Sequence, residues 1–363
     1  MATLTLDSVT KRFGAETVLA DVSLAVADKE TVVVFGPSGA GKTVLLRLIA
    51  GVHEPEEGAI LIDGEPMAGV PPERRDVGMA FQNFALFPHM SARDNIASPL
   101  EARRAGRAAI ERGVSDIARL LKIDHVLGHA PRELSNGQKQ RTALARALVA
   151  TPKILLLDDP LRNVDAKLRF EMRLELPRLL ARSDSAILYV TQDYKEAMAL
   201  GDRIAILMGG RLVQVATPED IYLAPATVDV ARLFGDPTIN LIEATATGGD
   251  GGGLFAPIGG HRVPLGGGYA DLDGRRVRLG IRPEHVRLEP RGAGVPVTVE
   301  AVTPLNERIV RLLVTDDGTE ILASAAAQDP GPDADEKVVL GVDPDAILLF
   351  DPDSGARIAR VSA

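Results

Sequence analysis

The stretch "TVVVFGPSGAGKTVLLRLIAG", residues 31–51, decides the fold class of this chain. The apolar run at 31–35 is typical of a buried strand, and the spacing of apolar residues after Thr43 is typical of a helix. Between them, "GPSGAGKT" fits the pattern G-x-x-x-x-G-K-[ST], in the strand–loop–helix context that gives this pattern its meaning. The stretch therefore predicts an α/β domain that binds a nucleoside triphosphate.

The chemistry of this loop follows from its residue types. Glycines let backbone N–H groups turn toward phosphate oxygens, and the start of the following helix adds a favourable dipole. We expect Lys42 to contact the β- and γ-phosphates and Thr43 to place its hydroxyl on Mg²⁺. The predicted nucleotide-binding segment is Gly36, Pro37, Ser38, Gly39, Ala40, Gly41, Lys42 and Thr43.

A second apolar strand, "ILLLDD" at 154–159, ends in two carboxylates. Asp158, at the carboxyl end of the strand, suits Mg²⁺ binding, and Asp159 suits contact with the water that attacks the γ-phosphate. Either carboxylate could instead cap the helix that begins near Asp165. We favour the metal role for Asp158.

Composition bounds the class of protein. The chain has 363 residues, enough for two or three domains, with 45% hydrophobic and 25% charged residues, as in ordinary globular proteins. It has no cysteine, no apolar run near the ~18 residues of a membrane span, and no secretory signal pattern at its N-terminus. A net charge of −9 argues against a general nucleic-acid binder. We expect a cytoplasmic protein.

The texture of the sequence changes after Gly235. Residues 1–235 alternate apolar strands with amphipathic helices, which predicts an α/β domain with a largely parallel sheet, and a hairpin at 203–216. Residues 236–363 hold short strand candidates punctuated by glycine and proline, as in "RRVRLGI" and "RIVRLLVT". This pattern predicts a small all-β barrel or sandwich.

Several further motifs, in order along the chain, carry a family resemblance. The segment "LSNGQKQRTALARAL" at 134–148 lies between the phosphate loop and the "LLLDD" strand, and "LRNVD" and "TQD" follow at 161–165 and 191–193. With Gln82 in "MAFQNF" and Phe13 in "KRFG", these motifs resemble the ATP-binding subunit of an ABC transporter. The C-terminal segments "FGDPTINLIEA" and "LGIRPEHVRL" are similar to those of importer ATPases for sugars, glycerol phosphate and polyols, which carry a C-terminal regulatory β domain.

The resemblance implies a fold and a set of partners. The fold would be a P-loop NTPase domain of the ABC type with a helical subdomain at about 85–150, followed by an OB-like or TOBE-type β domain at 236–363. Two ATPase subunits would dimerise beneath two membrane permeases, with an external solute-binding protein acting indirectly. The stretch Asn83–Asn95 is the expected permease-docking surface, with core packing of Phe84 and Phe87 as the alternative. The chain would then be peripheral, at the cytoplasmic face of the membrane.

The resemblance also assigns site roles. ATP and Mg²⁺ would be the cofactors, with Phe13 stacking on adenine and Gln82 reaching the metal and the nucleotide. ATP would be sandwiched between the phosphate loop of one subunit and the signature segment of the other. The signature residues expected to contact the partner's ATP are Ser135, Gly137 and Gln138. The expected catalytic residues are Lys42, Asp159 and Gln192.

Four positions depart from the family pattern: Asp159 replaces a glutamate, Gln192 a histidine, Asn136 a glycine and Arg162 a frequent serine. The Asp159 carboxylate is one methylene shorter, and a misplacement of about 1 Å can cost about 10²-fold in rate. Gln192 can donate a hydrogen bond but cannot carry charge or a proton. Asparagine tolerates the left-handed backbone region, so Asn136 is a milder change. We therefore expect ATP binding to persist and hydrolysis to be slow.

These departures leave several functional hypotheses. In the favoured one, the chain pairs with a related second ATPase subunit, completing a competent site there while its own site is slow. A homodimer with slower turnover is the alternative. A third is a regulatory half that does not hydrolyse ATP. A remote fourth is an ABC protein outside transport, against which the single phosphate loop and the acidic balance argue.

Overall fold

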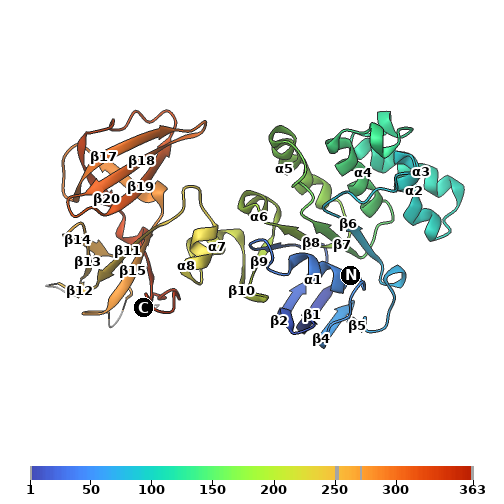
Figure 1. The fold of residues 1–363 in the computed structure, drawn as a ribbon, viewed down its shortest axis with the longest axis horizontal. Helices are drawn as coiled ribbons and strands as arrows, with labels where there is room; N and C mark the ends of the chain where they lie inside the picture. The colour runs from blue at the N-terminus through green and yellow to red at the C-terminus, as the bar shows by residue number, and fades with distance from the viewer. Residues whose placement is uncertain (1, 250–252, 270–271, 361–363) are drawn as a thin grey trace. The chain divides into compact units, whose positions relative to one another are not determined.

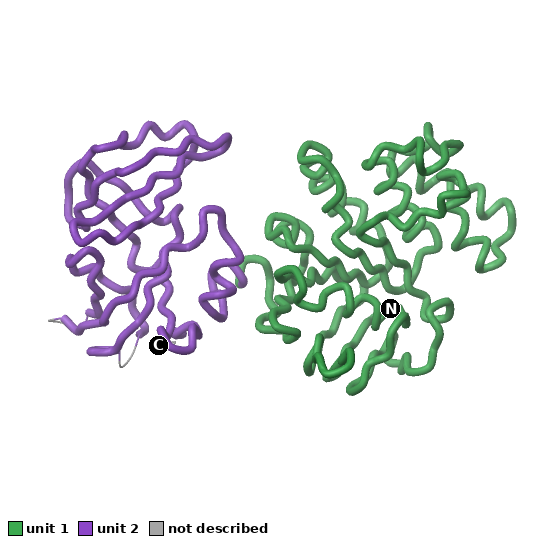
Figure 2. Tube along the Cα trace, in the orientation of Figure 1, with its two compact units in different colours: residues 1–220 green, residues 221–363 purple. Residues whose placement is uncertain are grey.

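The computed structural model describes residues 2–249, 253–269 and 272–360, which form two compact units, 1–220 and 221–363 (Figure 2). The division falls inside the short helix α7 (Pro218–Leu223), earlier than the change in composition after Gly235. The next helix, α8 (Val228–Leu233), belongs to the second unit because Val228 and Ala231 pack against Ile239 and Phe350. The domain bounds drawn from the sequence stay a prediction.

The central sheet of the first unit has six strands in the order β10-β9-β3-β8-β7-β6 (Figure 1). All neighbours are parallel except β9 and β10, the antiparallel hairpin that the sequence predicted. Every residue of β3, β7 and β8 is buried, as expected of a sheet covered on both faces. The strands are β3 (Thr31–Phe35), β6 (Val77–Ala80), β7 (Ile154–Asp158), β8 (Ala186–Thr191), β9 (Arg203–Met208) and β10 (Arg211–Ala216).

A second, antiparallel sheet of the first unit was not predicted from the sequence. Its strand order is β2-β1-β4-β5, and buried and exposed residues alternate along part of each long strand. Its inner residues join one core with the central sheet and with α1 (Lys42–Ile49), the helix after the phosphate loop. The strands are β1 (Leu4–Phe13), β2 (Glu16–Val26), β4 (Glu57–Ile62) and β5 (Glu65–Pro66).

The remaining helices of the first unit follow the expected strand–helix alternation. The segment between β6 and β7 is helical, and one helix follows each of β7 and β8. No helix among the described residues is long and apolar enough to span a bilayer. These helices are α2 (Ala92–Ala102), α3 (Arg107–Leu120), α4 (Asn136–Leu148), α5 (Ala166–Leu180) and α6 (Tyr194–Leu200).

Among its described residues the second unit holds three antiparallel sheets that share a hydrophobic cluster, which confirms the β-rich character predicted from the sequence. The sheet orders are β11-β15-β21, β12-β13-β14 and β16-β20-β17-β18-β19. The strands are β11 (Asn240–Thr245), β12 (Thr247–Gly248), β13 (Leu254–Ile258), β14 (His261–Leu265), β15 (Arg276–Ile281), β16 (Val286–Glu289), β17 (Val295–Pro304), β18 (Arg308–Thr315), β19 (Glu320–Ala326), β20 (Lys337–Val342) and β21 (Leu348–Phe350).

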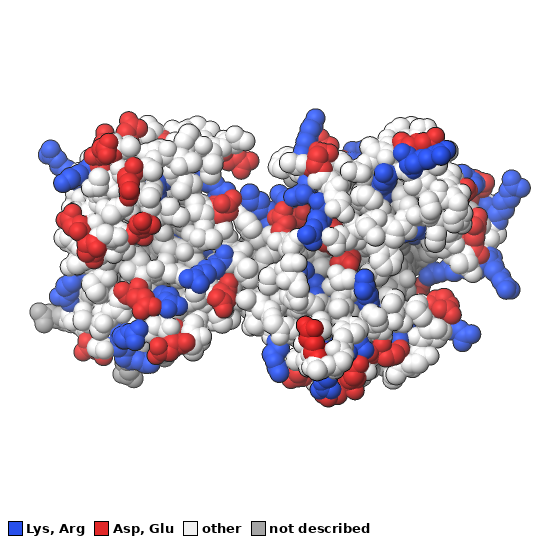
Figure 3. Space-filling model, viewed as in Figure 1, with Lys and Arg blue, Asp and Glu red and all other residues white. Residues whose placement is uncertain are grey.

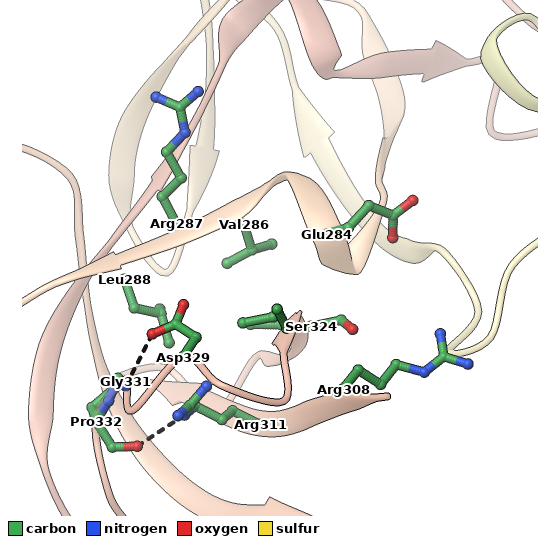
Figure 4. A pocket seen from close by; sticks show the side chains of 13 residues that line it. Glu284, Val286, Arg287, Leu288, Arg308, Arg311, Ser324, Asp329, Gly331 and Pro332 are labelled. Atoms are coloured by element: carbon green, nitrogen blue, oxygen red, sulfur yellow. Dashed lines mark hydrogen bonds between the residues drawn. The ribbon is translucent and has the colours of Figure 1, made fainter. Parts of the chain in front are cut away.

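A hollow of ≈ 570 Å³ in this unit is lined by residues of β16, β18 and β19 (Figure 4). The buried guanidinium of Arg311 forms part of its wall: Nε donates to the carbonyl of Pro332 at 2.9 Å and Nη2 to that of Pro330 at 3.1 Å. Gly331 lies directly over this guanidinium, where a Cβ atom would come within 2.2 Å of Nη2. The hydrogen bonds therefore hold this loop, and the positive φ of Gly331, +39°, favours glycine there.

Candidate active site

The phosphate loop joins β3 to α1. Its backbone is close-packed, since a Cβ on Gly36 would lie 2.1 Å from the carbonyl oxygen of Leu207. Gly41, the residue before α1, has a φ of +102°, which glycine adopts at little cost. The ammonium of Lys42 donates to the carbonyls of Gly36 at 2.8 Å and Pro37 at 2.7 Å, and burial lowers its pKa. The lysine ammonium thus lies within the loop, bonded to two of the loop's own carbonyls.

The two predicted metal ligands lie together beside this loop. The Thr43 hydroxyl, from α1, donates to Oδ1 of Asp158, at the end of β7, over 3.1 Å. Burial raises the pKa of Asp158, and the hydrogen bond from Thr43 partly opposes that shift. One hydroxyl and one carboxylate fit Mg²⁺, which usually takes one or two carboxylates and completes its octahedron with phosphates and water. The described residues hold no cluster of three or more His, Cys, Asp or Glu.

Asp159 follows Asp158 at the carboxyl end of the sheet. Its side chain is buried, its φ is +44°, and its N–H donates to the carbonyl of Val190 at 2.8 Å. Burial raises the pKa of Asp159 to about 6; the nearby charge of Arg162 opposes this shift and that of Asp158 adds to it. The helix-cap alternative is excluded for both carboxylates, because Asp165 caps α5 by accepting from Leu168 N at 2.9 Å.

Most of the predicted nucleotide and catalytic residues line one cavity of ≈ 250 Å³ at this edge of the sheet. Exposed Gln192 lies there, in the turn between β8 and α6. Arg162, noted in the sequence only as a departure, also lines this cavity. The predicted site residues among the lining are Ser38, Gly39, Gly41, Lys42, Thr43, Gln82, Asp158, Asp159 and Gln192.

Other predicted residues lie outside this lining. Phe13 is 44% exposed at the end of β1 and makes an edge-on contact with the His53 ring, at 5.4 Å between centroids. The signature residues form the start of α4, where the Ser135 hydroxyl accepts from Gln138 N at 3.3 Å and the Gln138 side chain accepts from Ser135 N at 2.9 Å. Roles for Phe13 on adenine, and for Ser135, Gly137 and Gln138 on a partner's ATP, stay predictions.

Two long-range contacts that the sequence did not reveal hold the Gln82 loop. The Asn163 side chain donates to the carbonyl of Gln82 at 2.8 Å. Buried Arg146, from α4, donates to the carbonyls of Ala85 at 2.8 Å and Phe84 at 3.1 Å, both residues with positive φ. Their costly backbone conformation is thus stabilised by a guanidinium from the signature helix.

The turn that carries Gln192 is held by hydrogen bonds to the buried carboxyl group of Glu196. Glu196 accepts hydrogen bonds from the hydroxyls of Tyr189 and Thr191, both at 2.9 Å. Burial raises the pKa of Glu196 to about 7, against these two hydrogen bonds. Two hydroxyls of β8 are therefore fixed to α6 across the turn that presents Gln192.

Comparison with known proteins identifies the family. The chain matches the ABC transporter family over residues 19–162, the MalK OB fold domain over 235–286 and the TOBE domain over 279–350. It is 40% identical over 360 residues to the sn-glycerol-3-phosphate import ATP-binding protein UgpC of Escherichia coli K12, covering 99% of this chain and 100% of that protein. The chain belongs to the ABC transporter family. It is an ATP-binding subunit with a C-terminal OB/TOBE region, as the motifs indicated.

Two further relatives agree with this assignment. UgpC of Salmonella typhi is 41% identical over 360 residues, with 99% of this chain and 100% of that protein covered. The dimeric, post-hydrolysis structure of the ATP-binding cassette MJ0796 with ADP and Pi covers 59% of this chain and 98% of its own, at 29% identity and a TM-score of 0.54. An ABC-type ATPase coupled to transport uses ATP and Mg²⁺, and its subunits dimerise and associate with permeases.

Proposed function

We propose that this chain is the ATP-hydrolysing subunit of an importer for sn-glycerol 3-phosphate or a related sugar or sugar alcohol. The observation that carries the proposal is the 40% identity to UgpC across 99% of the chain. The cavity at the sheet edge supports the ATPase role, because it collects phosphate-loop, metal and water-contacting side chains from four separate segments. The subunit would act at the cytoplasmic face, bound to its permeases.

In this proposal each side chain has a defined step. ATP phosphates lie on the backbone N–H groups of the loop, and Lys42 exchanges its two carbonyl partners for phosphate oxygens. The carboxylate of Asp159 accepts a proton from the attacking water, and Gln192 donates a neutral hydrogen bond to the γ-phosphate. Thr43 and Asp158 would hold Mg²⁺, which neutralises phosphate charge when bound.

We further propose that this site turns over slowly. Asp159 carries a shorter carboxylate than glutamate, and Gln192 gives a hydrogen bond about half as strong as a charge-assisted one. A slow site suits a subunit that pairs with a related, competent ATPase, to which Ser135, Gly137 and Gln138 would contribute. The size of complexes formed by the purified chain with Mg-ATP tests this pairing: a stable dimer of this chain alone would contradict it.

An apolar groove of ≈ 720 Å³ supports permease docking beside the Gln82 loop. Its lining joins that loop to β6, α2 and α4, so a helix inserted there would touch the loop whose Gln82 lines the ATP cavity. Phe87 belongs to the predicted docking stretch and is 42% exposed, which favours docking over core packing for that ring. Lining residues include Val77, Met79, Phe81, Ala85, Phe87, Pro99, Ala102 and Ala147.

Complementation tests the transport proposal. The gene would be expressed in Escherichia coli lacking UgpC, and uptake of radiolabelled sn-glycerol 3-phosphate would be measured. With the related ATPase subunit proposed above co-expressed, we expect uptake above the level of the strain that carries that partner alone, and no such gain from the Lys42→Ala variant. The same test would be run for sugars and sugar alcohols in strains that lack the corresponding ATPase. The transport proposal would be contradicted if the chain is stably expressed and co-purifies with the permeases but restores uptake of none of the three solute classes.

A further inference from the structure

Arg162 has a position in the ATP cavity that the proposed roles do not use. It follows Asp159 by one turn, and its N–H donates to the Asp159 carbonyl at 3.2 Å. This turn brings its guanidinium into the lining that also contains Lys42 and Gln192. The Nη1 atom lies 3.7 Å from Oδ2 of Asp159, with the arginine side chain 46% exposed. The guanidinium thus borders both the proposed base and open space for a ligand.

The backbone of Arg162 is fixed while its side chain is not. Arg169, on α5, donates through Nη2 to the Arg162 carbonyl at 3.1 Å and through Nε to the Leu161 carbonyl at 3.2 Å. The ion pair to Asp159 is long, at 3.7 Å, and its guanidinium is 46% exposed, so solvent weakens the attraction even though the Asp159 side chain is 11% exposed. Moving the guanidinium from Asp159 to a phosphate oxygen would therefore cost little and leave the loop in place.

The charges that line the cavity indicate why the Arg162 guanidinium would move toward a phosphate. Among the described residues that line the cavity, Lys42 and Arg162 are the two cations, and Gln192 is neutral. Phosphoryl transfer spreads negative charge over the γ-phosphate oxygens, and the catalytic gain comes from charges positioned to meet it. The guanidinium is planar and positively charged, and it can donate to two phosphate oxygens at once. The amide of Gln192 is neutral, so its hydrogen bond to a phosphate brings no positive charge.

We propose that Arg162 contacts the γ-phosphate of ATP bound to the same chain and stabilises the charge that develops during hydrolysis, in the place where Gln192 offers only a neutral donor. The water oxygen bonds to the γ-phosphorus as the bond from that phosphorus to the β–γ bridging oxygen breaks, and the electron pair stays on ADP. The water proton passes to Asp159 and then to solvent. Arg162 remains protonated throughout.

The inference rests on the proposed function, that this cavity hydrolyses ATP, so the test separates the two. Turnover and equilibrium ATP binding would be measured on the full chain, as wild type and with Arg162→Ser, Arg162→Lys or Gln192→His. Each Arg162 variant is also made in an Asp159→Glu background, which keeps a slow native rate measurable. The matched control is Arg178→Ser, an exposed arginine of α5 that forms no ion pair within the part of the chain described.

We expect Arg162→Ser to lower kcat by about 100-fold, the lower end of the cost of losing one oxyanion-hole donor. The Kd for ATP should change by less than about 3-fold, Arg162→Lys should retain part of the rate, and Arg178→Ser all of it. Gln192→His should restore most of the rate in the Arg162→Ser protein but add little to the wild type, because the two cations would act on the same charge.

Unchanged kcat in Arg162→Ser would overturn the inference and leave the proposed function standing. So would a loss of ATP affinity equal to the loss in kcat/KM, which would make Arg162 a binding residue only, or a failure of Gln192→His to restore the rate. Background turnover with bound ATP, in both wild type and Asp159→Glu, would overturn the proposed function and this inference together.

Discussion

The two sides of the ATP cavity are built differently. The phosphate-binding side consists mainly of backbone: a glycine loop, the start of α1, and one lysine held by two carbonyls. The side proposed to carry out hydrolysis consists of side chains from separate segments, Asp159 after β7, Arg162 in the next turn and Gln192 after β8. A backbone-built function survives most substitutions, whereas a side-chain-built one changes with a single methylene or charge. Under the proposed function, the same cavity would therefore bind ATP well and hydrolyse it slowly.

On the face seen in Figure 3, lysine, arginine, aspartate and glutamate side chains are interspersed over both units. This face has no broad basic patch, in agreement with the net charge of −9 calculated from the sequence.

We expect the largest effect, on ATP affinity, from Lys42→Ala on the phosphate-binding side. The substitution removes the ammonium that would exchange its two hydrogen bonds to carbonyls for hydrogen bonds to phosphate oxygens. Charge-assisted hydrogen bonds contribute about 1.5–3 kcal/mol each, so we expect ATP affinity to fall by about 100-fold or more. Titration calorimetry with Mg-ATP measures this, with exposed Lys29→Ala as control. A Kd for ATP within a few-fold of the wild-type value would contradict the distinction between the phosphate-binding side and the hydrolysis side of the cavity.

A smaller effect is expected from Arg146→Gln, which acts on the hydrolysis side from α4. The substitution removes the charge that holds the Phe84 and Ala85 carbonyls, so the Gln82 loop should lose order. Because functional strain needs surrounding support, we expect kcat to fall by about 3- to 10-fold with ATP affinity nearly unchanged. Steady-state kinetics checks this, with exposed Arg107→Gln as control. Equal losses in affinity and kcat would show that this loop serves binding.

The smallest effect is a pH dependence of stability at Glu196, under the Gln192 turn. Its pKa is about 7 in the fold against an ordinary 4.5. Between pH 4.5 and pH 7 the Glu196 carboxyl is ionised in the unfolded chain but still protonated in the fold. Its contribution to the free energy of unfolding is therefore full below about pH 4.5 and is lost as the pH rises through 7. The neutral amide of Glu196→Gln lacks this decline.

We therefore expect the Tm of Glu196→Gln, relative to wild type, to rise by a few degrees between pH 5 and pH 8. Differential scanning calorimetry across that range measures the difference, and exposed Glu219→Gln should show a constant one. A flat difference for Glu196→Gln would mean that the carboxyl is ionised at both ends of the range, and that the turn is held by charge.

The sequence predicted the parts of this fold that are encoded locally. The apolar runs of β3, β7 and β8 and the strands of the second unit were recognised because strand, turn and helix signals lie next to one another. The N-terminal antiparallel sheet was missed. Register shifts after Leu6, Val9 and Lys11 interrupt the two-residue alternation that identifies a half-buried strand.

The site shows the same limit. The phosphate loop and the carboxylates of Asp158 and Asp159 are contiguous motifs, so their chemistry was readable in order along the chain. Contacts such as Arg146 to Phe84, 62 residues apart, depend on where α4 packs and leave no local pattern. Arg162 was visible as a departure, but only the turn and the cavity show what its charge can reach.

One measurement tests the central claim most directly: ATP turnover by the purified chain and by its Asp159→Glu, Gln192→His double variant, both at saturating Mg-ATP with occupancy measured in parallel. We predict equal ATP binding, slow turnover in the wild type, and a rate about 10- to 100-fold higher in the double variant. Wild-type turnover within the ordinary enzyme range of about 1–10 s⁻¹, unchanged in the double variant, would contradict the account. It would mean that Asp159 and Gln192 already suffice for full hydrolysis.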